Sequence, residues 1–295
     1  SPVAWAQSPA LDPSFQVSRI FKVGDAVQAL EQADGKRILV GSFTYVHGEP
    51  AARLVRLLPG GTQLDAVFNQ NVSALTGAIY QVTALATGKL LLRTDYLQLG
   101  NTIRRNLVQL HPNGTLDPAF EASFGREYQD VVVQPDGKLV VAGTFPNAGG
   151  SQAPGVVRLE ATGAPDATFQ PYTIAGGQPI TCMARQPDGK ILVGGARVVR
   201  LLPTGEPDPS FSVAIPGGTV IQNLVVQPDG KILLLASQST GRAWPPLARL
   251  LPDGTPDPSF ATGSNFNEYI TAPNLTRPEQ CRSIALQADD KILVA

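Results

Sequence analysis

The chain has 295 residues, a formal net charge of −1 and an apolar fraction of 43%, enough to bury a substantial core. The balanced charge provides no electrostatic footprint for nucleic acid or for an anionic membrane, so we predict no nucleic-acid partner. No apolar run is long enough to span a bilayer, and we predict no transmembrane segment in this chain.

The first ten residues differ from all that follows. Ala4 and Ala6 stand in the small-residue pattern of a signal-peptidase site, within Ser1-Pro2-Val3-Ala4-Trp5-Ala6-Gln7. We interpret residues 1–10 as the remnant of a secretory leader and expect a secreted or cell-surface protein. The last residues, Lys291 to Ala295, would stop inside a strand, so we expect the chain to be a fragment of a longer one.

Residues 11–295 repeat themselves with a period of roughly fifty residues, which predicts a repeat architecture. The first recurring motif is Asp-x-x-Phe, at Asp12/Phe15, Asp65/Phe68, Asp117/Phe120, Asp166/Phe169, Asp208/Phe211 and Asp257/Phe260. The second is an Asp-Gly-Lys turn or a variant of it, at Asp34-Gly35-Lys36, Thr87-Gly88-Lys89, Asp136-Gly137-Lys138, Asp188-Gly189-Lys190, Asp229-Gly230-Lys231 and Asp289-Asp290-Lys291.

Residues 129–170 illustrate one repeat. A β-branched run at 130–134 meets the turn Pro135-Asp136-Gly137-Lys138, and an apolar run returns at 139–145, which predicts a hairpin. A third run at 156–159, a turn at 161–163 and a short run at 167–169 predict a second tight hairpin.

Strands two and three of each repeat should pair, because one repeat has lost most of the connection between them. Only Gly194-Gly195-Ala196-Arg197 separates the runs 191–193 and 198–201, and both runs survive. Each repeat is then a four-stranded antiparallel meander.

We therefore predict an all-β fold: a β-propeller of four-stranded antiparallel blades, about six in this chain, with the last one incomplete. A parallel β-helix is the rival fold, but it usually has a shorter repeat and does not need two hairpin turns per unit. A strand at residues 11–15 would complete the last blade and close the ring, which removes exposed sheet edges. The recurring Phe should fill the seams between blades, where loss of one ring would cost about 3–5 kcal/mol.

The phrases Val-Gln-Pro-Asp-Gly-Lys-Ile-Leu and Arg-Leu-x-Pro-x-Gly-x-x-Asp-Pro-Ser-Phe resemble the delta-60 repeat, a β-propeller family of secreted bacterial proteins. The resemblance covers essentially residues 11–295. It is sharpest at residues 186–211 and 227–260, and weaker at residues 81–93 and at the C-terminal end. It implies an extracellular or cell-surface protein with additional domains C-terminal to this chain. It brings no catalytic residues, because the motif consists of turn and core positions.

We predict no cofactor, no metal and no catalytic residue. Each recurring turn Asp stands alone after Pro or Ala, unlike a calcium loop, and is interpreted as a turn residue. The Asp of Asp-Pro-Ser-Phe should accept backbone hydrogen bonds in an Asx-type turn. Cys182 and Cys281 lie in non-adjacent repeats without a Cys-x-x-Cys motif, so we expect two free thiols.

One end of the strands should carry the binding residues. The connections between strands one and two, and between strands three and four, are short and regular, whereas the other connections vary. In a meander these two classes lie at opposite ends, so one propeller face should be uniform and the other diverse. Tyr, Trp and Arg, which are enriched at interaction hot spots, gather in the variable connections. We predict a ligand-binding surface there, formed by Tyr45, His47, Tyr96, Arg104, Arg105, Arg126, Tyr128, Tyr172, Trp244 and Tyr269.

Three functions remain open. The favoured one is a secreted or cell-surface binding or scaffold module for a protein or glycan at the variable-loop face. The alternative is a polysaccharide hydrolase or lyase with carboxylates at the propeller mouth, drawn from Asp95, Glu127, Asp130 and Glu268. Such chemistry needs two carboxylates about 5–10 Å apart, which a sequence does not reveal. The third is a spacer that holds other domains away from a cell surface.

Overall fold

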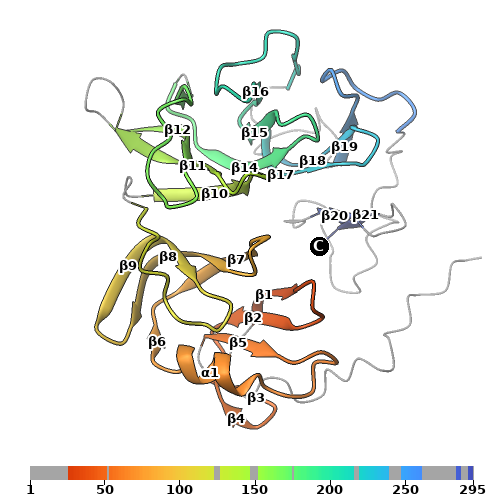
Figure 1. Ribbon diagram of the computed structural model, residues 1–295. Helices are drawn as coiled ribbons and strands as arrows, with labels where there is room; N and C mark the ends of the chain where they lie inside the picture. Colours follow the sequence, from red (N-terminus) through yellow and green to blue (C-terminus); the bar gives the residue numbers. More distant parts are fainter. Residues whose placement is uncertain are drawn as a thin grey trace, which may run out of the picture. The chain divides into compact units, whose positions relative to one another are not determined.

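The computed structural model describes residues 26–51, 53–122, 127–146, 152–174, 176–215, 219–238, 247–260, 284–286 and 292–294. The chain divides into two compact units, Ser1–Phe120 and Glu121–Ala295 (Figure 1). The predicted leader at residues 1–10 and the predicted closing strand at residues 11–15 lie outside the described residues. No helix among the described residues is long and apolar enough to cross a membrane.

The first unit contains repeats 1 and 2. In repeat 1, an antiparallel sheet has the order β1-β2-β5, formed by β1 (Ala26–Glu31), β2 (Arg37–Gly41) and β5 (Leu54–Leu57). A small hairpin of β3 (Tyr45–Val46) and β4 (Glu49–Pro50) stands in the connection between β2 and β5. In repeat 2, β8 (Leu90–Leu99) pairs with β7 (Ile79–Ala84), β9 (Thr102–Leu110) and, at its distal end, β6 (Leu75–Thr76).

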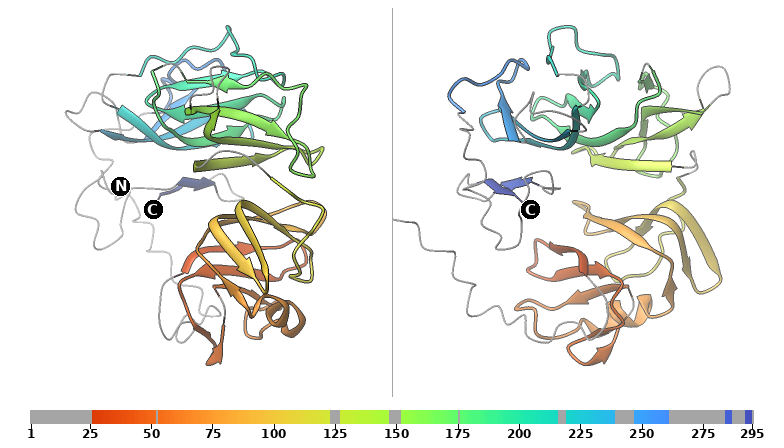
Figure 2. Two further views of the ribbon diagram at one scale, coloured as in Figure 1. Left: turned by 90° about the vertical axis from the view of Figure 1, so that its left-hand side faces the viewer. Right: turned by 180° about the vertical axis from the view of Figure 1, so that it is seen from behind.

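The second unit contains repeats 3, 4 and 5 and part of another (Figure 2). Repeat 3 comprises β10 (Glu127–Val133), β11 (Leu139–Pro146), β12 (Gln152–Leu159) and β13 (Tyr172–Thr173). Repeat 4 comprises β14 (Ile180–Arg185), β15 (Ile191–Gly195) and β16 (Val198–Leu201). Repeat 5 comprises β17 (Thr219–Val226), β18 (Ile232–Gln238) and β19 (Leu247–Leu250), and the final hairpin comprises β20 (Ile284–Leu286) and β21 (Ile292–Val294).

The predicted meander is confirmed by the pairing of these strands. Strand two is hydrogen-bonded antiparallel to strands one and three in each of the five repeats, including repeat 4 with its shortened connection. Within each unit, the first strands of successive repeats lie next to one another, β1 beside β7 and β10, β14, β17 and β20 in series. The chain is therefore all-β in design, with repeated antiparallel sheets stacked as propeller blades.

The fourth strand of each repeat is shorter than predicted. In the described residues the predicted segment forms only isolated bridges, Leu57↔Leu64, Leu110↔Leu116, Leu159↔Pro165, Leu201↔Pro207 and Leu250↔Pro256. In repeat 3 the chain then pairs with β12 a second time, as β13. The ladder ends because the following Asp bends the chain: the Asp208 carboxylate accepts a hydrogen bond from Ser210 N at 2.9 Å, and Pro209 between them has no N–H to donate. In repeat 1 the Asp caps a helix instead, α1 (Ala66–Val72), whose N-cap residue Asp65 accepts from Phe68 N.

The regular turns have the predicted chemistry. In repeat 4 the Asp188 side chain accepts a hydrogen bond from Lys190 N at 3.1 Å, and Gly189 has φ +88°, a conformation that favours glycine. The Asp34, Asp136 and Asp229 side chains make the same bond to the following Lys. The Asp-Gly-Lys motif is thus a strand-one to strand-two turn.

The recurring Phe fills the seam between consecutive repeats, as predicted. Phe68 of repeat 1 is fully buried in a cluster with Leu90 and Val108 of repeat 2. Phe169 packs with Ile180 and Ile191 of repeat 4, and Phe211 of repeat 4 packs with residues of repeat 5, including Ile221 and Leu250. Because each blade has apolar residues on both faces, the core is a series of seams between sheets.

Candidate functional site

Lysine, arginine and aspartate side chains meet at the uniform ends of the strands. In repeat 4 the Asp208 Oδ2 atom lies 2.9 Å from Arg200 Nε and 3.3 Å from Lys190 Nζ. Lys190 belongs to the turn between strands one and two, Arg200 to strand three, and Asp208 to the turn that follows. The cluster therefore ties the two regular turns of one repeat together.

The same three side chains recur around Asp65, Asp166 and Asp257. Each arginine also covers the ring of the recurring Phe, with Arg200 4.5 Å from the Phe211 ring centre. Where the next repeat is described, a second nitrogen of the same arginine donates a hydrogen bond to a turn of that next repeat. For example, Arg158 Nη1 of repeat 3 donates to the Pro203 carbonyl of repeat 4 at 2.7 Å. Repeat 2 is the exception, because Gln109 stands in the arginine position. There Lys89 Nζ lies 2.7 Å from Asp117 Oδ2, and His111 Nε2 lies 3.8 Å from Asp117 Oδ1.

These contacts shift the ionisation of the aspartates. At Asp208 the hydroxyl and backbone N–H of Ser210 hold the pKa well below its usual range, with further support from Lys190 and Arg200. At Asp166, burial alone would raise the pKa, but hydrogen bonds from Lys138, Thr168 and Arg158 outweigh it and lower the pKa. Strongly perturbed carboxylates are candidates for catalysis, but here every one has a structural cation.

The Asx-type turns of these aspartates were predicted from the sequence and are confirmed, whereas the ion cluster was not predicted. The sequence does contain a pattern that indicates the arginine–aspartate pair, because an arginine precedes the Asp by the same number of residues in repeats 3, 4 and 5. Only the folded chain brings the turn lysine to the same carboxylate.

The β3–β4 hairpin of repeat 1 holds two of the predicted binding residues. His47 and Gly48 both have positive φ, 54° and 85°, as a two-residue hairpin turn of this kind requires. His47 Nε2 lies 2.9 Å from the carbonyl oxygen of Gly61, in the turn after β5. The hairpin thus places His47 in contact with the regular turn after β5 in its own repeat. Tyr45 lies beside it in β3 and is half-buried.

In repeat 2 the connection between strands two and three consists almost entirely of the strands themselves. β8 and β9 continue to a tight turn at residues 100–101, and this extended hairpin carries Tyr96, Arg104 and Arg105. The segment before β7 lies along it, because β6 pairs with residues 98 and 99. Gly77 connects β6 to β7 with φ +104°, and a Cβ there would overlap the Tyr96 carbonyl.

The two faces of this hairpin differ. Leu92, Leu97 and Leu99 point to the core cluster shared with repeat 1, and Arg104 lies opposite Leu97 on that face. The register of β8 with β9 shifts between Thr94 and Leu97. Because side chains alternate on either side of this shift, Arg93, Gln98 and Arg105 lie on the other face, and Ile103 lies there opposite Gln98. Tyr96 joins them through a hydrogen bond from its hydroxyl to Gln98 Oε1 at 2.7 Å. The structure therefore separates Arg104 from Arg105.

A β-bulge in β7 adds Tyr80 to this second face. The register shifts between Ile79 and Gln81, which turns Tyr80 toward β8. Its hydroxyl donates to Asp95 Oδ2 at 2.5 Å, and the Arg93 guanidinium lies 5.4 Å from its ring centre. The hydrogen bond to Asp95, and then burial, raise the pKa of Tyr80. We call the resulting group the repeat-2 strip: Tyr80, Arg93, Asp95, Tyr96, Ile103 and Arg105.

The repeat-2 strip is exposed. Tyr80 is 41% and Ile103 52% exposed, and among the described large apolar residues only Val67 on α1 is more so. Tyr96 and Arg105 of the strip were predicted from the sequence. Tyr80, Arg93, Asp95 and Ile103 were not assigned to a binding surface, because their common face depends on the bulge and on the long register of β8 with β9.

The remaining predicted residues are dispersed or undescribed. Tyr128 in β10 and Tyr172 in β13 belong to opposite edges of the repeat-3 sheet, and both are half-buried. Burial raises the pKa of Tyr172. Arg126, Trp244, Tyr269, Glu268 and the side chain of Glu127 lie outside the described residues.

The other carboxylate and thiol candidates have structural partners. Asp130 Oδ2 accepts a hydrogen bond from Met183 N at 2.7 Å, which ties repeat 3 to repeat 4. Cys182 is a free, buried thiol, and burial raises its pKa to about 12. Cys281 lies outside the described residues. In the described part of the chain no three His, Cys, Asp or Glu side chains gather closely enough to hold a metal ion.

Comparison with known proteins yields one family match. The family described as "Domain of unknown function (DUF5122) beta-propeller" matches residues 32–63, 85–120, 134–169, 186–211 and 227–260, more than half of the chain. These five segments coincide with the five repeats seen in the structure. A search of curated proteins found no match.

Several solved structures are similar in fold. "YCF48 bound to D1 peptide" shares 13% identity at a TM-score of 0.45, covering 75% of this chain and 62% of that one. A puromycin hydrolase shares 15% identity at 0.48, covering 77% and 37%. The extracellular domain of a putative hybrid two-component system, BT4673 from B. thetaiotaomicron, shares 12% identity at 0.45, covering 93% and 38%. The chain thus spans less than two thirds of each of these proteins.

Proposed function

We propose that this chain, which belongs to the DUF5122 beta-propeller family, is a secreted or cell-surface binding module that holds a protein partner on the repeat-2 strip. The Ala4-x-Ala6 pattern and the resemblance to the delta-60 repeat support the extracellular location. A propeller scaffold with uniform turns at one end and divergent connections at the other supports a binding role.

One observation carries the choice of surface: an exposed aromatic ring and an exposed aliphatic side chain share a face with two arginines. Tyr80 and Ile103 would bury their apolar area on binding, and Arg105 is exposed beside them. Tyr and Arg are the residue types that dominate the energy of protein interfaces. The Tyr80 hydroxyl and the Asp95 carboxylate are already bonded to each other, so the strip is ordered before a partner arrives.

The test compares capture of partners from the culture medium or cell surface of the source organism. The wild-type chain and a Tyr80→Ala/Ile103→Asp/Arg105→Glu variant are immobilised, and bound proteins are identified by quantitative mass spectrometry. We expect one protein to be retained by the wild type and reduced about tenfold or more by the variant, a loss of at least 1.4 kcal/mol. The matched control is Val67→Asp, which removes an apolar side chain on α1 that is more exposed than Ile103 or Tyr80.

Equal capture by the triple variant and the wild type would reject the proposal. Binding of a purified glycan that survives removal of proteins would replace the protein partner by a sugar. The hydrolase or lyase alternative stays a prediction and is tested by turnover of a panel of polysaccharides. In all cases the melting temperature of the variant should match that of the wild type, because the three side chains are exposed.

A further inference from the structure

The strand β9 has backbone groups that point away from its neighbour β8. β9 pairs with β8 on one side only, and its other side is an edge of the repeat-2 sheet (Figure 1). The turn between the two strands has two residues, so the flanking Leu99 and Thr102 bond to each other. Backbone direction alternates along a strand, so the N–H and C=O groups of Ile103 and Arg105 point outward. The Ile103 carbonyl fits this direction, because it accepts a hydrogen bond from Arg104 Nη1 at 3.2 Å.

This edge can be reached from solvent near the tip of the hairpin. Ile103 is 52% exposed and Arg105 is also exposed, whereas Leu107, further along β9, is 1% exposed. Among the described residues, β9 has no strand partner on its outer side before the isolated bridge from Leu110 to Leu116. The reachable edge is therefore the stretch from Ile103 to Arg105.

Repeat 3 shows that this side of strand three accommodates another strand. The carbonyls of Arg158 and Gln109 accept the same hydrogen bond from the following Asp, so Pro154 in β12 is equivalent to Arg105 in β9. In repeat 3 the chain returns as β13, antiparallel to β12, and Ile174 N donates to the Pro154 carbonyl at 3.0 Å. The residues of repeat 2 that correspond to β13, 123 and 124, lie outside the described residues.

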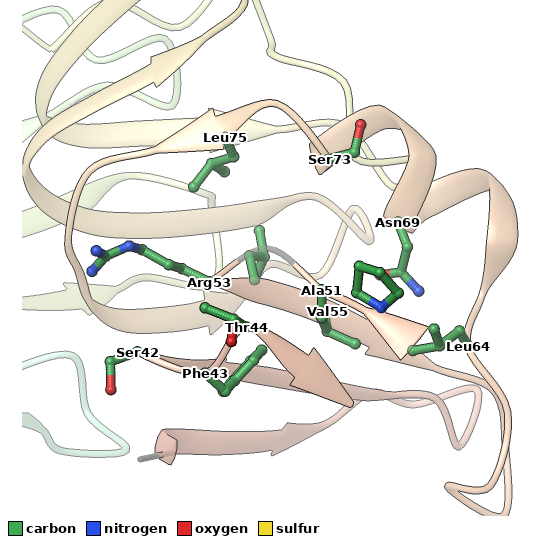
Figure 3. Close-up of a pocket in the computed structure, with 12 residues that line it drawn as sticks. Ser42, Phe43, Thr44, Ala51, Arg53, Val55, Leu64, Asn69, Ser73 and Leu75 are labelled. Carbon is green, nitrogen blue, oxygen red and sulfur yellow. The ribbon is translucent and has the colours of Figure 1, made fainter. Parts of the chain in front are cut away.

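A pocket in repeat 1 offers a partner less contact than this edge. It has a volume of about 350 Å³ (Figure 3). Its lining residues Phe43, Leu54 and Val55 are each at most 1% exposed, so an incoming side chain meets its polar rim and little apolar surface. The exposed edge of β9 is therefore the better candidate for a binding site.

The edge of β9 carries positive charge on both faces of the sheet. Arg105 lies on the face of the repeat-2 strip, and Arg104 lies on the opposite face. β9 itself contains no acidic residue. A second copy of this chain would bring the same arginines together, and like charges opposite each other destabilise a strand pair. Acidic side chains on an incoming strand would complement both arginines.

We propose that the protein partner of the repeat-2 strip adds an extended acidic segment to β9 as a further antiparallel strand. The backbone of Ile103 and Arg105 bonds the segment, and two successive carboxylates pair with Arg105 and Arg104 on the two faces. In strand addition the backbone provides affinity and the side chains provide sequence preference. A guanidinium can donate two parallel hydrogen bonds to a carboxylate. This inference rests on the proposed function, because Ile103 and Arg105 belong to the strip.

The test uses the whole chain and a fluorescent synthetic peptide, Gly-Thr-Glu-Glu-Ile-Thr-Gly. In the antiparallel register its first Glu lies opposite Arg105, its second Glu opposite Arg104 and its Ile opposite Ile103. We expect saturable binding with a Kd below about 1 mM by fluorescence anisotropy.

Backbone N-methylation of the peptide separates strand addition from side-chain binding. The amides of the first Glu and of the Ile face β9, so methylating either one should weaken binding about tenfold or more. The amide of the second Glu faces solvent, so methylating it should change the affinity much less. Equal weakening by all three methylations, or absence of binding by the unmodified peptide, would overturn strand addition.

Matched protein variants locate the site. Arg105→Glu should bind the acidic peptide about tenfold more weakly and should bind a peptide with Lys in place of both Glu. Arg53→Glu, which changes an exposed arginine of repeat 1, should bind the acidic peptide like the wild type. Melting temperatures equal to that of the wild type establish that both variants are folded. Equal binding of the acidic peptide by Arg105→Glu and the wild type would overturn the site.

The proposed function and strand addition fail on different results. Loss of natural partner capture in the triple variant, together with no alternation among the methylated peptides, would keep the strip as an interface and overturn strand addition. A dimer of the wild-type chain that Ile103→Asp abolishes, measured by sedimentation equilibrium, would identify a second copy as the occupant and overturn the acidic partner.

Discussion

Lys138 Nζ lies 2.8 Å from Asp166 Oδ2, although the two residues are 28 positions apart in the chain. Arg158 Nε reaches the same oxygen at 2.6 Å from strand three. One carboxylate thus joins the first turn of the repeat, its third strand and its last turn. Because Arg158 also reaches Pro203, the contact extends to the next repeat. The uniform end of the propeller is held together by charge as well as by the Phe seams.

Asp208→Asn should destabilise the protein by about 3 kcal/mol, because it leaves the buried Arg200 guanidinium without its counter-charge. Urea denaturation followed by circular dichroism measures the change. Asp188→Asn is the matched control, since Asp188 is 53% exposed and an Asn side chain keeps the turn hydrogen bond. An equal effect of the two substitutions would show that the cluster contributes nothing beyond the turn.

The stability should fall in acid. The pKa values of Asp166, Asp208 and Asp257 are lowered in the folded state, so their contribution is present above the unfolded-state pKa of about 3.9. It is lost as the pH falls from about 4 toward the lowered folded-state values. Thermal melts should therefore give a steady midpoint between about pH 5 and 7 and a decreasing one below about pH 4. An unchanged midpoint at pH 2.5 would contradict this, and Asp208→Asn should flatten the decrease.

Phe68→Ala should cost about 3–5 kcal/mol, because the ring is fully buried between repeats 1 and 2 and its loss leaves a cavity. Equilibrium denaturation is the measurement. The neighbouring Val67→Ala serves as control, since Val67 is 62% exposed and should change stability by less than about 0.5 kcal/mol. A cost below about 1 kcal/mol for Phe68→Ala would mean that the seam repacks.

Gln109→Arg should stabilise the protein by on the order of 1 kcal/mol. The substitution restores in repeat 2 the arginine that pairs with the Asp of the other repeats, next to Asp117, which is 3% exposed. The melting temperature should rise by about 2–4 °C. A decrease would indicate that the larger side chain displaces Lys89 from Asp117 without replacing its interaction.

Cys182 should resist alkylation in the folded protein. Its thiol is buried and its pKa is raised to about 12, so little thiolate exists at pH 8. In a Cys281→Ser background, iodoacetamide labelling followed by mass spectrometry should show modification only after denaturant is added. Rapid labelling of the native protein would mean that the seam between repeats 4 and 5 opens readily.

Several features could be predicted from local patterns alone. The Asp188-Gly189-Lys190 turn follows from side-chain capping and from the φ of glycine, which neighbours in sequence decide. The pairing of β15 with β16 follows from the shortness of residues 194–197. The length of the fourth strand was predicted wrongly, because the same Asp that marks the motif captures the backbone N–H groups and ends the ladder.

The repeat, its turns, the strand order and the apolar seams follow from the amino-acid sequence, since these features depend on residues a few positions apart and on a period of roughly fifty. Which charged groups meet and which side chains share a face is set only when the chain folds. Lys138 and Asp166 come together only when two hairpins fold side by side, and Tyr80 reaches Asp95 only because a bulge turns it there. Contacts of this kind depend on register, and one residue of shift in a strand moves every side chain to the opposite face.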